Sequence, residues 1–175
     1  MNYVRRVEPK ALLAHAGIDP AKAPGFLGSL RAGAFWQVVT PVNGLDSELI
    51  DSKLVKSVKS DVDDTSKRSS LLMICRSLQD AIFIQDYQGF LKDTPVTVKS
   101  AYSFKLNSSM HKVWEFKYGN KDRLYFFTLQ QQLILLMFCH KKDQNTPEHV
   151  KKYCEKAMRP FLMPKAPVQI IEDKS

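Results

Sequence analysis

Cationic side chains that could hold an anion gather in one part of the chain. The stretch Phe138–His149 reads FCHKKDQNTPEH, and its residues His140, Lys141 and Lys142 follow an apolar run. Between residues 111 and 142, six Lys and Arg accompany only Glu115 and Asp122. This local excess of four positive charges suits a phosphate backbone. The sequence therefore predicts an anion site here, with a loop made soluble by its charges as the alternative.

A three-stranded meander must position these cations. VWEFKY (113–118) alternates apolar and charged residues, GNK (119–121) is typical of a turn, and RLYFFTL (123–129) is strand-like. A three-residue loop pairs Lys117 with Arg123 and Glu115 with Tyr125, because a slip by one residue would mix the faces. In this register Lys117 and Arg123 oppose each other, away from the apolar face. The run LILLMFCH (133–140) predicts a central strand.

A helix is predicted after this strand. Thr146 suits the N-cap, Pro147 the first helical position and Glu148 the first turn. Val150, Tyr153, Cys154, Ala157 and Met158 follow at helical spacing. We expect Pro160 to stop this helix, and residues 168–171 could add an edge strand.

The first part of the chain is expected to be a separate extension, partly helical and of unknown role, over residues 1–69. Its predicted elements are helices at 11–16, 26–32 and 45–58 and a short strand at 35–39. The polar, charged segment 59–70 predicts a long loop, and the domain boundary is placed there, so that residues 70–175 form the second domain. In residues 71–93, a strand followed by a helix from about 77 to 92 is expected. An extended segment then follows Pro95.

Composition limits the class of protein. The net charge is +8, and residues 71–175 carry 16 Lys and Arg against 10 Asp and Glu. This bias favours a polyanionic partner such as nucleic acid, a ribosome or an acidic protein. No apolar run approaches the ~20 residues that span a membrane, and no secretory signal is recognisable. Cys75, Cys139 and Cys154 lack metal-ligand spacing, so reduced thiols in a cytoplasmic protein are expected, with no metal or cofactor.

Two ordered motifs carry a resemblance to a known family. They are Trp114-Glu115 on the first strand and a KK…Q.TP signature made by Lys141, Lys142, Gln144, Thr146 and Pro147. Residues 104–158, about a third of the chain, resemble the C-terminal half of RelE/HigB-type toxins of bacterial toxin–antitoxin systems, in the phage-related branch. The resemblance implies an α+β fold, with a small curved antiparallel sheet packed on helices.

The resemblance also implies an activity. Many such toxins are ribosome-dependent endoribonucleases that cleave mRNA without metal by attack of the 2′-hydroxyl and are controlled by an antitoxin. This chemistry needs a base, an acid and cations that stabilise the phosphorane. The candidate catalytic residues are Arg123, His140, Lys117 and Tyr125, with Arg123 stabilising the transition state and His140 or Lys117 as acid or base. The candidate RNA-binding residues are His111, Lys112, Lys121, Lys141 and Lys142.

Two other functions stay open. The chain could be a non-catalytic binding or inhibitory protein with the RelE fold, encoded by a phage or mobile element, or a toxin that poisons gyrase. The expected partners are an antitoxin protein, mRNA and the ribosome, with no membrane. The RNA-cleavage hypothesis requires that Arg123 and His140 converge on one concave surface.

Overall fold

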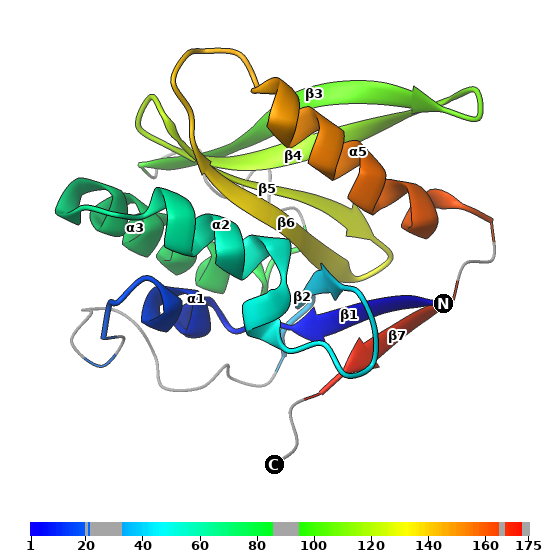
Figure 1. The fold of residues 1–175 in the computed structure, drawn as a ribbon, viewed down its shortest axis with the longest axis horizontal. Helices are drawn as coiled ribbons and strands as arrows, with labels where there is room; N and C mark the ends of the chain where they lie inside the picture. The colour runs from blue at the N-terminus through cyan, green and yellow to red at the C-terminus, as the bar shows by residue number, and fades with distance from the viewer. Residues whose placement is uncertain (20, 22–32, 86–94, 165–166, 173–175) are drawn as a thin grey trace.

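A seven-stranded sheet with helices on both faces forms the protein (Figure 1). The computed structural model describes residues 1–19, 21, 33–85, 95–164 and 167–172. The strand order is β3-β4-β5-β6-β2-β1-β7. The α+β class expected from the sequence is confirmed, but the sheet is larger than expected and mixed, since β2 runs parallel to β6 and β7 runs parallel to β1.

The strands and helices have the following bounds. The strands are β1 Asn2–Arg6, β2 Gln37–Val42, β3 Val96–Leu106, β4 Ser109–Tyr118, β5 Asp122–Leu129, β6 Gln132–His140 and β7 Val168–Ile171. The α-helices are α1 Pro9–His15, α2 Lys53–Asp61, α3 Thr65–Ala81 and α5 Glu148–Leu162, and a short 3-10 helix, η2, spans Leu49–Asp51.

The hairpin of β4 and β5 has the register that the sequence predicts. Lys117 pairs with Arg123 and Glu115 pairs with Tyr125. Gly119 adopts φ +63° in the turn, a conformation that glycine reaches without steric cost. The antiparallel ladder then continues to β6, interrupted by a bulge at which Phe126 pairs with Leu135 and Tyr125 with Met137.

Both faces of the sheet are buried. Phe116, Leu124 and Phe126 pack with α1, α2 and α3, while Tyr125 and Phe127 pack with α5 on the other face. The alternation in the sequence predicts a single apolar inner face, with Lys117 and Arg123 away from it. That prediction is wrong, because the second helix layer covers the face that carries Arg123.

The N-terminal residues belong to the same sheet. β2 pairs with β6 on one side and with β1 on the other. β7, the expected edge strand at 168–171, pairs with the outer edge of β1. α1 packs against α3, and the proposed boundary between residues 69 and 70 falls within α3.

The polar segment 59–70 is mostly helical rather than a loop. Ser52 caps α2 by accepting a hydrogen bond from the Val55 N–H, and Asp64 caps α3 by accepting one from the Lys67 N–H. Residues 71–75, expected as a strand, are also in α3, and η2 and a short connection replace the first half of the helix expected at 45–58. The predicted helix at 26–32 and the segment 86–94 lie outside the described residues.

α5 differs from the prediction at both ends. Pro147 occupies the N-cap position, so the helix begins at Glu148. Pro160 lies within the helix, which ends only at Leu162. Because a proline lacks an N–H, it removes one bond from the last turn, yet Phe161 is buried and extends the packing of α5 on the sheet.

The free edge of β6 is covered by side chains of α2. β2 pairs only with Gln132–Ile134, so the later N–H groups of β6 need other acceptors. Ser57 Oγ accepts from the Phe138 N–H at 2.9 Å, and Asp61 Oδ2 accepts from the His140 N–H at 3.0 Å. Side chains of α2 thus supply the hydrogen-bond acceptors that a neighbouring strand would otherwise provide to the second half of β6.

Of the helices in the described ranges, none combines the length and apolar character that a membrane-spanning helix needs.

Replacing Ser57 with Ala should lower the free energy of unfolding by about 1–3 kcal/mol, because the buried Phe138 N–H loses its acceptor. Urea unfolding followed by circular dichroism measures this. Ser69→Ala, at an exposed position of α3, is the control and should change stability by less than about 0.5 kcal/mol. Equal stability of the two variants would show that α2 does not complete the edge of β6.

Candidate anion-binding site

Four adjacent strands each supply one cation to the face covered by α5. Lys99 lies on β3, Lys117 on β4, Arg123 on β5 and Lys141 directly after β6. The register aligns them, since Lys99 pairs with Glu115, Lys117 with Arg123 and Arg123 with Cys139. The Lys141 N–H donates to the Lys121 carbonyl at 2.8 Å, which continues the ladder beyond β6. We call Lys99, Lys117, Arg123 and Lys141 the cation row.

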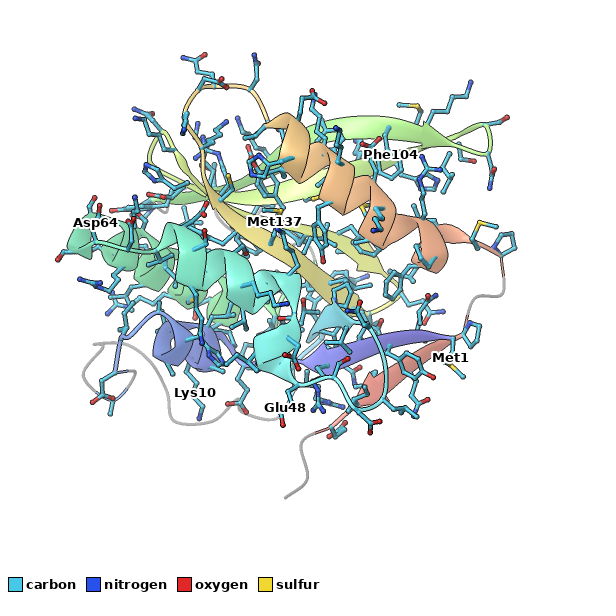
Figure 2. The ribbon with its side chains drawn as sticks, viewed as in Figure 1. Met1, Lys10, Glu48, Asp64, Phe104 and Met137 are labelled. Atoms are coloured by element: carbon cyan, nitrogen blue, oxygen red, sulfur yellow. The ribbon has the colours of Figure 1, made fainter. Side chains whose placement is uncertain are left out.

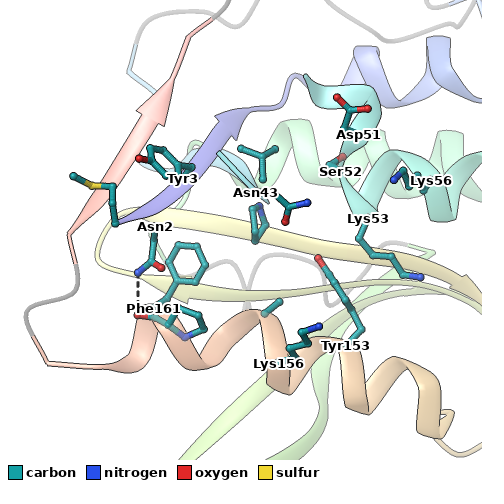
Figure 3. Close-up of a pocket in the computed structure, with 15 residues that line it drawn as sticks. Asn2, Tyr3, Asn43, Asp51, Ser52, Lys53, Lys56, Tyr153, Lys156 and Phe161 are labelled. Atoms are coloured by element: carbon teal, nitrogen blue, oxygen red, sulfur yellow. Dashed lines mark hydrogen bonds between the residues drawn. The ribbon is translucent and has the colours of Figure 1, made fainter. Parts of the chain in front are cut away.

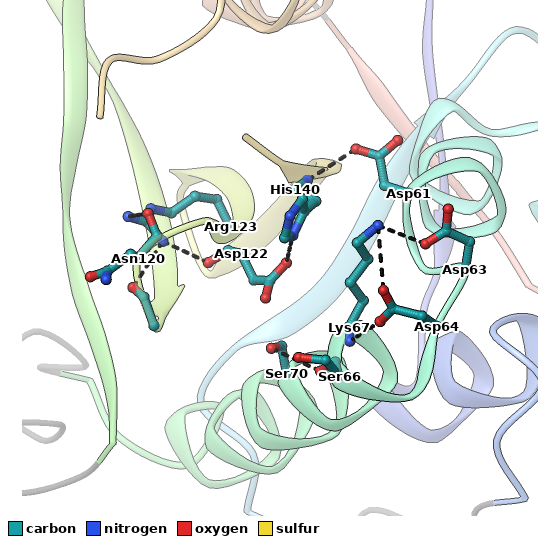
Figure 4. A network of polar contacts seen from close by, with 11 residues as sticks. Asp61, Asp63, Asp64, Ser66, Lys67, Ser70, Asn120, Asp122, Arg123 and His140 are labelled. Carbon is teal, nitrogen blue, oxygen red and sulfur yellow. Dashed lines mark hydrogen bonds and ion pairs between the residues drawn. The ribbon is translucent and has the colours of Figure 1, made fainter. Parts of the chain in front are cut away.

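Arg123 is a structural anchor within this row. Its side chain is 2 % exposed, and its Nε lies 3.3 Å from Glu115 Oε2. Nη1 donates to the carbonyls of Asp122 and Gly119, at 2.9 and 3.3 Å, and Nη2 donates to the Asn120 carbonyl at 3.1 Å (Figure 4). The guanidinium therefore holds the β4–β5 turn and is buried, so this geometry does not support its expected role at the transition state.

The other cations surround the same carboxylate. Lys99 Nζ lies 3.6 Å from Glu115 Oε1, and the Lys99 side chain is 52 % exposed. Lys141 is only 4 % exposed, and its Nζ donates to the Gln144 carbonyl at 2.6 Å. Burial lowers the pKa of Lys141, and so do the nearby charges of Arg123, Lys99 and Lys117, whereas Glu115 raises it. One buried carboxylate thus stands among four cations, so the local field favours a further anion.

Tyr125 is the cross-strand partner of Glu115 and is fully buried. Burial, followed by the charge of Glu115, raises the pKa of its phenol. The buried Tyr125 hydroxyl has no hydrogen-bond partner among the residues described, and Glu115 Oε2 and Arg123 Nε are joined by the 3.3 Å ion pair but by no hydrogen bond. Because the Tyr125 side chain is buried, its expected catalytic role is not supported by this geometry.

His140 projects from the opposite face of the sheet. Side chains alternate along a strand, so His140 shares a face with its cross-strand partner Asp122, whereas Arg123 shares a face with Cys139. The His140 Nδ1 lies 2.7 Å from Asp122 Oδ1 (Figure 4). The expected convergence of Arg123 and His140 on one concave surface is therefore absent.

His140 instead lines a cavity of about 640 Å³ between the ends of α2 and β6 and the beginnings of α3 and α5, the histidine pocket. Its lining includes the lysines Lys67, Lys141 and Lys142, the carboxylates Asp61, Asp63, Asp143 and Glu148, and a second histidine, His149. Lys67 lies 2.6 Å from Asp63 and lowers the pKa of that carboxyl. This pocket offers a carboxylate-oriented imidazole but lacks the positive excess of the cation row.

The remaining predicted RNA-binding residues are dispersed. His111 packs on the Phe104 ring near the other end of β4, with 5.9 Å between ring centroids. Lys112 lies on the face opposite Lys117, 5.5 Å from the centroid of Trp114. Lys121, whose carbonyl accepts from the Lys141 N–H, and Lys142, the next residue in the chain, are both exposed. The structure thus brings together Lys117, Arg123 and Lys141, with Lys121 and Lys142 beside them.

Three residues of the cation row and the histidine pocket region are not predicted from the sequence. Lys99 depends on the pairing of β3 with β4, which contains an irregularity between Ser100 and Tyr102, so its register was not readable. The position of Asp122 beside His140 could be predicted from the sequence, because extending the β5–β6 ladder places the two residues opposite each other. Asp61 lies in the segment that the sequence predicts to be a loop.

No group of three or more His, Cys, Asp or Glu within the described ranges is arranged to hold a metal ion. Cys139 is 2 % exposed, and burial, together with Asp61, raises the pKa of its thiol to about 11. It is therefore a buried core residue rather than a nucleophile.

Comparisons of the chain with known protein families, with curated proteins and with solved structures find no match. The RelE/HigB resemblance accordingly rests on the two sequence motifs.

Arg123→Ala should destabilise the fold by about 3–5 kcal/mol, because the buried Glu115 would lose its buried counter-ion and keep only the exposed Lys99 as a partner. Chemical denaturation of the variant measures this change. Lys117→Ala, at the cross-strand partner of Arg123, should cost less than about 1 kcal/mol. An Arg123→Ala protein as stable as the parent would refute the anchoring role.

Proposed function

We propose that this protein binds RNA along the cation row, as a binding protein rather than through a catalytic Arg123. One observation carries this proposal, namely that four adjacent strands each direct one cation to the same sheet face around a single buried carboxylate. The accessible lysines of this row suit the repeated charges of a phosphate backbone, which supply most sequence-independent affinity for nucleic acid.

The four cations would have different tasks. Arg123 and Lys141 are buried and hold the β4–β5 turn and the segment after β6. Lys99 and Lys117 are accessible, and Lys117 has no ion-pair partner among the described residues, so these two would contact phosphates directly. Exposed Lys121 and Lys142 would extend the binding surface along the strand ends.

RNA is favoured over other polyanions by the sequence motifs. Lys141 and Lys142 belong to the signature that resembles RelE/HigB-type toxins, many of which act on mRNA in the ribosome. In this proposal a ribosome-bound message is the natural target, and an antitoxin-like protein would compete for the same surface.

A second candidate function is metal-independent mRNA cleavage at the histidine pocket. The favouring observation is the 2.7 Å separation of Asp122 Oδ1 and His140 Nδ1, which would orient the imidazole and leave Nε2 to transfer a proton. Lys67 and His149 line the same pocket and would supply a cation and a second acid–base group.

Lys117→Glu combined with Lys99→Glu should weaken binding to a single-stranded RNA by at least about tenfold and reduce its salt dependence. For each phosphate that the variant no longer neutralises, the slope of log K against log salt should fall by about 0.7–1. Fluorescence anisotropy at several salt concentrations measures both quantities.

Lys112→Glu is the matched control, since it reverses a charge on β4 but on the opposite face. It should leave RNA affinity within about twofold of the parent. If Lys112→Glu weakens binding as much as the double variant, the RNA does not lie on the cation row.

Induced expression in a bacterium, with mRNA ends mapped on ribosomes, separates the two candidates. If the histidine pocket is catalytic, the parent should produce cuts and His140→Gln should abolish them, because the proton-transfer group is removed. RNA binding in vitro without any cuts by the parent would reject cleavage and keep the binding function. Cuts that persist in His140→Gln would reject His140 as the catalytic group.

A further inference from the structure

A second cavity lies away from the cation row, towards the C-terminal half of α5. It has a volume of about 450 Å³ and is bounded by β1, the end of β2, the beginning of α2 and the second half of α5 (Figure 3). Figure 2 draws the side chains of the molecule in the view of Figure 1, with Met1 of the lining labelled. We call this cavity the lysine pocket.

Three lysines from two helices line the lysine pocket. Lys53 and Lys56 come from α2 and Lys156 comes from α5 (Figure 3). Lys53 Nζ also lies 5.7 Å from the centroid of the Tyr153 ring. For Lys56 and Lys156, the described part of the chain provides no ion-pair partner. The pocket therefore has cations available for a ligand.

The lining of the lysine pocket carries little negative charge. Asp51 is the one carboxylate among the lining residues, and its Oδ2 accepts a hydrogen bond from the Glu48 N–H at 3.1 Å. α2 begins at Lys53, so the positive end of the helix dipole lies at the same wall. The electrostatics of the pocket therefore favour an anion with more than one charge.

The rest of the lining is aromatic and apolar. Tyr3, Phe161 and Pro41 form one side, and a hydrogen bond from Asn2 Nδ2 to the Pro160 carbonyl, at 2.9 Å, ties β1 to the end of α5. Tyr153 contributes a phenol hydroxyl that can donate a hydrogen bond at neutral pH, and burial raises its pKa further. A ligand with both a charged group and a flat apolar body would use both sides of the pocket.

We propose that the lysine pocket binds a phosphate monoester attached to a planar ring system, of the size of a nucleoside monophosphate. Lys53, Lys56 and Lys156 hold the phosphate, while the rings of Tyr3 and Phe161 contact the planar group. The volume lies within the roughly 300–1,000 Å³ of small-molecule sites. This binding is independent of RNA binding, since it involves none of the cation row.

The test is calorimetric titration of the full chain with AMP, and separately with adenosine, ribose 5-phosphate and inorganic phosphate. AMP should bind saturably with one site, at least about tenfold tighter than each of the other three, because only AMP fills both sides of the pocket. The inference is overturned if AMP does not bind. It is also overturned if inorganic phosphate, ribose 5-phosphate or adenosine binds as tightly as AMP.

Variants locate the binding. Lys53→Gln combined with Lys156→Gln should weaken AMP binding by at least about tenfold, whereas Lys156→Arg, which keeps the charge, should retain most of the affinity. Lys152→Gln, on α5 but outside the lining, is the matched control and should bind AMP like the parent. Equal reductions in affinity in the control and the double variant would overturn the site.

The Lys99→Glu and Lys117→Glu double variant should bind AMP normally, so failure of the lysine pocket and failure of RNA binding are distinguishable.

Discussion

The buried ion pair of Arg123 and Glu115 is the interaction on which the rest of the site depends. Both side chains are almost fully buried on the sheet face against which α5 packs, and removing either partner would leave a buried charge without its buried counter-ion. The guanidinium also bonds three carbonyls of the β4–β5 turn, so the pair fixes the end of the hairpin. With Glu115 paired to Arg123, the charges of Lys99, Lys117 and Lys141 are left in excess, and in the proposed function this excess attracts the RNA.

The N-terminal part of the chain makes this arrangement possible. β1 and β2 extend the sheet beyond β6, and α2 covers the remaining edge of β6 through Ser57 and Asp61. Without these residues the central strand would present unpaired N–H groups along one side. The same segment supplies one wall of each cavity, since α2 contributes Asp61 to the histidine pocket and Lys53 to the lysine pocket. Residues 1–69 are thus integral to the sheet and to both pockets.

Local patterns predicted the hairpin well and the site less well. The register of Lys117 with Arg123 followed from alternation and loop length, which are properties of neighbouring residues. Which face of the hairpin meets solvent depends on α5, a helix from a distant part of the chain. The alternation of residues in the hairpin does not reveal this packing. For that reason the sequence predicts an accessible Arg123, whereas the structure buries it. His140 was assigned to the site because it adjoins Lys141 in sequence, although adjacent residues of a strand point to opposite faces. Lys99 was missed because an irregular ladder sets its position.

Mapping an RNA oligonucleotide onto the amide resonances of the ¹⁵N-labelled protein tests the central claim most directly. Binding at the cation row predicts that the largest chemical-shift changes occur at Lys99, Lys117, Lys121 and Lys142, with small changes at Lys112 and His111. Changes centred on His140 and Lys67, or spread evenly over the lysines of the molecule, would contradict the account.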